Sequence, residues 1–159
     1  MEQQEVFVQV ALRSWNGQME NADKFFDSLS DEEMMKEVSP GKNRVIYLLG
    51  HLVAVHDRML ELLGAGDRLY ANLDEAFIGS PDKSGHDFPE IAVLRADWKK
   101  SKEAVTAAFA KFTPADWLGR HMSMTDEDLV KDPARNRLSV LLSRTNHLSY
   151  HLGQVKLVR

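Results

Sequence analysis

The apolar residues of the chain recur at alternating spacings of three and four, as Val8, Trp15 and Ala22 with the residues between them illustrate. This spacing is typical of an α-helix that buries one face against other helices. Four stretches show it: residues 4–29, 43–63 and 89–112, and a last one from 136 almost to the C-terminus. No segment alternates apolar and polar residues for long enough to predict a β-strand. The pattern therefore predicts an all-α protein built as a four-helix bundle.

The connections between these stretches carry signals of their own. Ser30 and Glu33 form a capping-box pattern, which predicts a short helix after the first stretch. Asp87 is the candidate N-cap of the third stretch. Residues 65–88 and 119–135 are polar and long for connections inside a compact domain. We therefore expect a bundle with long connections, of which the first either crosses the molecule or covers a site.

Composition narrows the class of protein. The 159 residues predict a single domain, 1–159. The absence of cysteine excludes disulfides, thiolate ligands and a cysteine nucleophile. With 20 Lys and Arg against 24 Asp and Glu, the chain carries a net charge of −4 and is a poor candidate for nucleic-acid binding. No run reaches the roughly 18 apolar residues of a membrane span, and the polar, acidic start is unlike a signal peptide, so we expect a cytoplasmic protein.

Six histidines are the residues best suited to chemistry in this composition. His86 and His121 stand in polar connections, where we expect solvated side chains. His56 follows His51 by five residues, which turns it about 140° away on a helix. We therefore interpret His56 as a residue at the boundary of the core, and none of these three as functional.

His51, His147 and His151 differ because helical geometry turns all three toward the core. His147 and His151 are four residues apart on the last helix, so they share one face with its apolar residues. His51 lies at the edge of the apolar face of the second helix. Burial of three imidazoles is costly unless each ring nitrogen has a partner, and one divalent metal ion supplies a partner to all three. The alternative is a polar pocket, since the pattern lacks the adjacent glutamate of an HExxH motif.

Two segments of the chain resemble the DinB/YfiT-like superfamily of four-helix-bundle proteins. They are Asn43–Leu52, which ends in Gly-His-Leu, and Asn146–Gln154, which contains His-x-x-x-His-x-Gly-Gln. In that family the matching histidines bind one divalent metal, and here they are His51, His147 and His151. The resemblance therefore implies one metal ion per chain. Zinc or nickel is favoured, with iron, copper and manganese as alternatives.

The same resemblance implies a function in outline. The better-understood branches are metal-dependent transferases and isomerases that use low-molecular-weight thiols such as bacillithiol, mycothiol or glutathione, and others resemble metal-dependent hydrolases. We therefore expect a thiol transferase or hydrolase for a small-molecule substrate, and the resemblance also implies a homodimer. Three protein ligands leave a coordination position for water or substrate, which is typical of a catalytic site. Two alternatives remain: a non-catalytic metal- or ligand-binding bundle, and a dimerisation module with a polar histidine core.

A few side chains near these histidines are candidates for substrate binding. Arg144 precedes the histidine pair of the last helix by one turn. We expect it either to hold a carboxylate or phosphate of the substrate or to pair with an acid on another helix. The same two interpretations apply to Arg44 and Arg58, and Gln154 is expected to hydrogen-bond near the site. The sequence identifies no general base and no partner for the remaining ring N–H groups.

Overall fold

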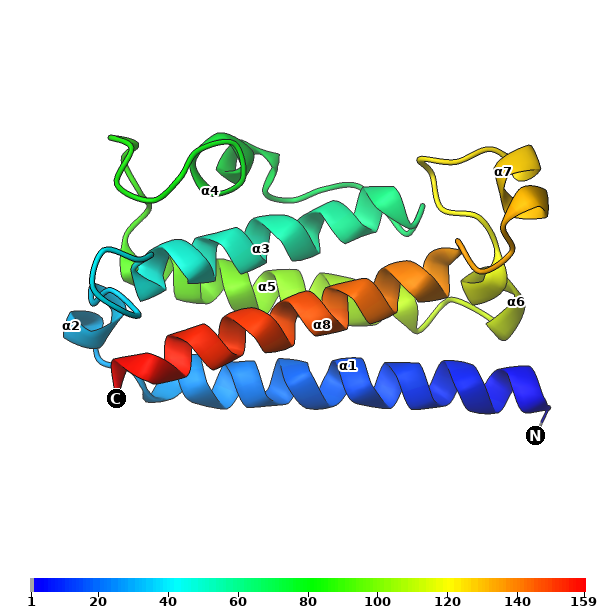
Figure 1. Ribbon diagram of the computed structural model, residues 1–159, viewed down its shortest axis with the longest axis horizontal. Coiled ribbons are helices and arrows are strands. Elements are labelled where there is room, and N and C mark those ends of the chain that lie inside the picture. The colour runs from blue at the N-terminus through cyan, green and yellow to red at the C-terminus, as the bar shows by residue number, and fades with distance from the viewer. Residues whose placement is uncertain (1) are drawn as a thin grey trace.

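The computed structural model describes residues 2–159 as an all-helical chain (Figure 1). Its four long helices lie in the four stretches whose periodicity predicts helices. They are α1 (Gln3–Ser28), α3 (Val45–Leu62), α5 (Ile91–Phe109) and α8 (Arg137–Val155). No β-strand occurs in the described part of the chain. The prediction of an all-α protein is therefore confirmed.

Shorter helices occupy the connections, so the structure has more helices than the four that the periodicity predicts. They are α2 (Asp31–Met34), η1 (Ala71–Leu73), α4 (Asp74–Phe77), α6 (Pro114–Leu118), α7 (Asp126–Lys131) and, at the end, η2 (Lys156–Val158). The predicted capping box of α2 is confirmed, because the Ser30 hydroxyl accepts a bond from the Glu33 N–H and the Glu33 carboxylate accepts one from the Ser30 N–H. α4 and α7 escape the periodicity because helices of four and six residues have too few positions to show it.

The predicted start of the third long helix is wrong. α5 begins at Ile91 with Glu90 as its N-cap, three residues after the predicted cap Asp87. Phe88 packs its ring against Phe77 with 4.5 Å between the ring centroids. A proline follows Phe88, and the residue before a proline is disfavoured in helical conformation. The chain therefore stays non-helical until Glu90.

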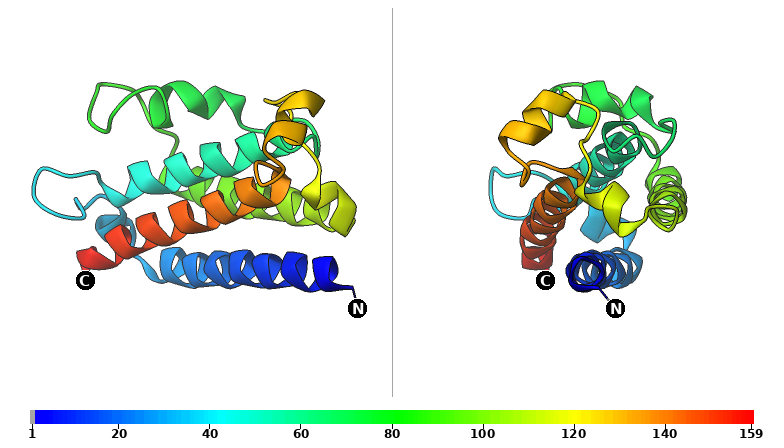
Figure 2. Two further views of the ribbon diagram at one scale, coloured as in Figure 1. Left: turned by 45° about the vertical axis from the view of Figure 1, so that its right-hand side comes forward. Right: turned by 90° about the vertical axis from the view of Figure 1, so that its right-hand side faces the viewer.

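The four long helices form a ring in the order α1, α8, α3, α5 (Figures 1 and 2). α1 and α8 run in one direction, and α3 and α5 run in the opposite one (Figure 1). α5 thus starts at the end of the molecule where α3 starts. The chain between Leu62 and Ile91 has to travel back along the bundle, and it does so over α3, where η1 and α4 form (Figure 1).

This returning connection buries the outer face of α3. Fourteen of the 18 residues of α3 are buried, although a helix covered on one side only would expose about half. Leu73 and Phe77 of the connection are themselves buried. A Cβ atom at Gly50 would lie 2.2 Å from the Phe77 ring, so glycine is what allows this close approach. α3 is therefore the centre of the core, and the side chains it carries lie inside the protein.

Membrane insertion was not expected from the sequence. Among residues 2–159, no helix combines the length and the apolar character that crossing a membrane requires. The most apolar long helix, α3, finds its apolar partners within the protein: Leu48, Leu52 and Met59 are fully buried. Its hydrophobicity is therefore accounted for by the core.

Candidate metal centre

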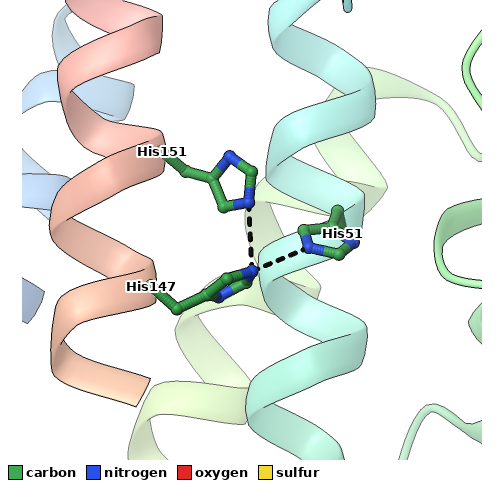
Figure 3. A group of neighbouring side chains, drawn as sticks. All are labelled: His51, His147 and His151. Atoms are coloured by element: carbon green, nitrogen blue, oxygen red, sulfur yellow. Dashed lines mark hydrogen bonds between the residues drawn. The ribbon is translucent and has the colours of Figure 1, made fainter. Parts of the chain in front are cut away.

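The three histidines singled out in the sequence meet between α3 and α8 (Figure 3). His51 projects from α3, and His147 and His151 project from α8 toward it. The Nε2 atom of His147 lies 3.1 Å from Nε2 of His51 and 3.0 Å from Nε2 of His151. One nitrogen from each ring lies within 4.8 Å of the others. These residues are called the histidine triad below.

Helix geometry accounts for this convergence. The spacing of four residues places His147 and His151 one turn apart on the same face of α8. The start of α8 is fixed by a cap in which the Asn136 side chain accepts a bond from the Ser139 N–H. α3 runs antiparallel beside that face, so its early residue His51 lies level with the late residues of α8 (Figures 1 and 3). The triad is thus a product of local spacing on α8 and of the packing of α8 on α3.

The far nitrogens of two triad rings are held by hydrogen-bond acceptors. Nδ1 of His51 lies 2.7 Å from the main-chain oxygen of Phe77, and Nδ1 of His151 lies 2.6 Å from the side-chain oxygen of Gln154. A carbonyl oxygen only accepts, so both Nδ1 atoms carry the proton. A neutral imidazole has one N–H, and the Nε2 atoms of both rings therefore present lone pairs toward the third ring.

The single proton that Nε2 of His147 can carry does not satisfy both of the lone pairs that face it. Its Nε2 atom faces two lone pairs but can donate at most one hydrogen. Its Nδ1 atom is buried and has no hydrogen-bond partner. A cation between the three Nε2 atoms removes this conflict, because each nitrogen then directs its lone pair at positive charge.

Burial keeps all three rings neutral, which is the form that binds metal. Desolvation is the largest cause that lowers the pKa of His51 and of His151, even though hydrogen bonds to Phe77 and Gln154 act in the opposite direction. Desolvation together with the neighbouring histidines and Arg144 lowers the pKa of His147 to about 4. Protons therefore compete weakly for these nitrogens at neutral pH.

The donor set fits a divalent metal ion. A tetrahedral ion with ligands at about 2.0–2.1 Å separates ligand nitrogens by roughly 3.3–3.4 Å. The two short Nε2 separations, 3.0 and 3.1 Å, need to grow by only a few tenths of an ångström. Among residues 2–159, no Asp or Glu forms a hydrogen bond to these rings, so three imidazoles make up the set. The triad can hold one metal ion and leaves positions for other ligands.

Two of the remaining histidines lie elsewhere than the sequence predicts. His56 is 1% exposed, because its ring packs against Trp15 of α1 and Trp98 of α5. Its interpretation as a boundary residue is wrong. His121 is also buried, at 6% exposure, because its loop packs on the end of α3. Only His86 is exposed as expected, and it bonds to the Ser80 hydroxyl.

The arginines near the triad separate into paired and unpaired residues. Arg58 pairs with Asp74 of α4 at 2.7 Å, which confirms for Arg58 the interpretation that it pairs with an acid on another helix. Arg44 pairs at 2.8 Å with Asp82, an acid that lies in the connection and not on a helix. Arg144 is half-buried and its Nε atom has no hydrogen-bond partner. Among residues 2–159, no acidic side chain pairs with Arg144, so its pairing with an acid on another helix is not seen.

Gln154 and two aromatic rings complete the surroundings. Gln154 lies at the site, as expected, but its contact is with His151, and binding of substrate by Gln154 stays a prediction. Tyr47 stacks on His51 with 6.2 Å between the ring centroids, and Tyr150 packs edge-on against His151. Tyr47 precedes His51 by four residues, a spacing that signals contact on a helix. No signal in the sequence identifies the Phe77 carbonyl as a partner of His51, because every residue has a main-chain carbonyl.

These features define an all-helical protein with a histidine triad between two antiparallel helices. The family model of the DinB superfamily matches residues 15–155 of the chain, which include the triad, and the protein belongs to this superfamily. The resemblance seen in the sequence is thereby confirmed. A comparison with curated proteins gives no match.

Proposed function

We propose that the protein binds one divalent metal ion at His51, His147 and His151 and acts as a metal-dependent enzyme of the thiol transferase or hydrolase type. The observation that carries the proposal is the direction of the lone pairs. The Nε2 atoms of His51 and His151 both aim at Nε2 of His147, which can satisfy only one of them. Membership of the DinB superfamily supports the assignment of the ligands.

The chain's own residues prepare the site for chemistry. Phe77 and Gln154 fix the tautomers of two rings, so the ligand nitrogens are preorganised. Burial holds the pKa of His147 at about 4, which keeps this ring neutral and able to bind. A divalent ion with an open position supplies Lewis acidity and lowers the pKa of a coordinated thiol or water. Because cysteine is absent, a reacting thiol has to arrive as part of the substrate.

The choice of metal follows from the donors. Neutral imidazoles without thiolate or carboxylate favour zinc or nickel over the hard cations, with iron, copper and manganese as alternatives. The protein is purified without an affinity tag, and its metal content is measured. One ion per chain is the expected result, and a protein that binds none of these ions from solution contradicts the proposal.

Activity is tested on the metal-loaded protein with two panels of compounds. One panel combines electrophiles with low-molecular-weight thiols, and the other contains simple esters and amides. Turnover that disappears on chelation and returns with the ion supports the enzyme. Stoichiometric metal without turnover in either panel favours the alternative, a non-catalytic metal- or ligand-binding bundle. Light scattering of the same sample tests the homodimer that family membership suggests.

A further inference from the structure

A cavity of about 510 Å³ opens between α3, α8 and two connections, one helical turn from the triad. Three of the side chains that line it are arginines: Arg58 of α3, Arg68 of the returning connection and Arg144 of α8. Met122 and Ser123, from the loop that packs on the end of α3, close another side. The cavity thus brings three positive charges together in a protein whose net charge is negative.

Two of the three arginines are held by acidic groups. Asp74 receives hydrogen bonds from Arg58 at 2.9 and 2.7 Å and from Arg68 at 2.7 and 2.6 Å. Arg68 also pairs at 2.9 Å with Asp57, which is fully buried. Asp57 also accepts hydrogen bonds from the main-chain N–H groups of Leu69 and Tyr70. Asp74 therefore fixes both arginines in the cavity wall, and Asp57 fixes Arg68 a second time.

Arg144 has no counter-charge among residues 2–159. Its Nε atom is buried and no acceptor lies within hydrogen-bond distance. Burial, with the nearby charge of Arg58, lowers the pKa of Arg144, and an arginine with a lowered pKa still carries its full charge at neutral pH. A cation taken partly out of water without a partner destabilises the folded protein. Proteins retain such groups where a ligand supplies the missing charge.

The position of Arg144 relates this cavity to the triad. Arg144 precedes His147 by three residues, which is about 4.5 Å along the helix. Its charge is close enough to lower the pKa of His51 and of His147. Arg58 lies seven residues after His51 on α3, and Arg144 lies three residues before His147 on α8. Because α3 and α8 are antiparallel (Figure 1), both arginines are displaced from the triad toward the same end of the bundle. Arg144, which lines the cavity, therefore lies one helical turn from the triad, although no triad histidine lines the cavity itself.

We propose that Arg144 binds an oxyanion, a carboxylate or a phosphate, of the small-molecule substrate and thereby directs its reacting group to the triad. The planar guanidinium donates parallel hydrogen bonds to two oxygens, which is the geometry that both anions share. The link to the substrate rests on the proposed metal-dependent function, whereas binding of the anion does not. Glu61 also lines the cavity and forms no ion pair among residues 2–159. Its carboxylate is therefore the group within the protein that would compete with a bound anion for Arg144.

The test is a calorimetric titration of the full-length protein with inorganic phosphate and, separately, with succinate at low ionic strength. We expect one site, with the tighter of the two ligands identifying the class of anion. R144Q is expected to weaken binding about tenfold or more, the effect of a lost charge-assisted hydrogen bond, and R144K to fall between. R13Q removes an exposed arginine of α1 that lines no part of this cavity, and it should bind as the wild type does.

Further variants separate this proposal from the metal site. H147A is expected to lose the metal and to keep anion binding, and R144Q is expected to keep the metal. The anion proposal is overturned if the wild type binds neither anion, if R144Q binds as tightly as R13Q, or if only E61Q gains a site. The last result would show that Glu61 neutralises Arg144. A wild-type protein that binds an anion but no metal ion would overturn the proposed function alone.

Discussion

The main-chain oxygen of Phe77 accepts a hydrogen bond from Nδ1 of His51 at 2.7 Å. Phe77 ends α4, in the connection that carries the chain back from the end of α3 to the start of α5. The bond decides which nitrogen of His51 is protonated and which faces the other two histidines. A segment required by the topology therefore also orients a candidate metal ligand.

Substitution of the α8 histidines should remove the metal and leave the fold. H147A and H151A each delete one of three nitrogens, and two imidazoles are too few to retain an ion through dialysis. We expect less than stoichiometric metal by elemental analysis and an unchanged helical circular-dichroism spectrum. H86A is the matched control, because His86 is exposed in the connection and should not affect the metal. Stoichiometric metal in both α8 variants would refute the ligand assignment.

The contact between Gln154 and His151 should contribute to metal affinity. Q154L removes the acceptor of Nδ1 of His151, which frees the ring to rotate and to change tautomer. We expect metal affinity, measured by competition with a chelator, to fall about 10- to 100-fold. Q154E keeps an acceptor at the same place and should retain most of the affinity. Equal affinities of Q154L and the wild type would show that this contact is unimportant.

Addition of a methyl group at Gly50 should disturb both the fold and the site. In G50A the new Cβ would meet the buried ring of Phe77, so the connection has to shift away from α3. We expect a loss of about 1–3 kcal/mol in the free energy of unfolding, together with weaker metal binding, because the Phe77 carbonyl moves with the ring. The control is G17A on α1, where nothing lies within 4 Å of an added Cβ. That variant should match or exceed wild-type stability in chemical denaturation.

The metal-free protein should lose stability as the pH falls below about 6.5. Burial, assisted by the nearby charges of Arg144 and the triad, lowers the pKa of His56 to about 3. Between these values the unfolded chain binds a proton that the folded chain does not, so the free energy of unfolding falls with falling pH. Each such histidine contributes a slope of up to about 1.4 kcal/mol per pH unit.

A variant isolates the contribution of His56 to this pH dependence. H56L has a similar volume and no titrating group. The slope of unfolding free energy against pH between about 4 and 6 should therefore decrease by up to about 1.4 kcal/mol per pH unit, which corresponds to one proton. The triad histidines titrate in the same direction, because burial also lowers the pKa of each of them. Their contribution remains in H56L. An unchanged slope would show that His56 is accessible to protons in the folded state.

Local sequence pattern was sufficient to predict the long helices and the inward direction of the three triad histidines. The positions of α1, α3 and α8 follow from apolar spacing, and Asn136 marks the start of α8 because a side chain that caps a helix acts on residues a few positions away. The inward direction of His147 and His151 is likewise a property of one helix. The same local geometry placed His51 at the edge of the apolar face of α3, and the family motif then matched all three histidines.

Contacts between distant segments were decided by the tertiary structure. His56 is buried by rings from α1 and α5, and His121 is buried because its loop packs on the end of α3. A pattern on one helix does not contain that information. The partners of Arg58 and Arg144 depend on which acidic residues the connection brings near. The acceptor for His51 is a main-chain carbonyl, which leaves no trace in the residue type. The sequence thus determined the inward direction of the three triad histidines, because helical periodicity is a local property. Packing determined which groups they meet, because the returning connection brings together residues that are far apart in the chain.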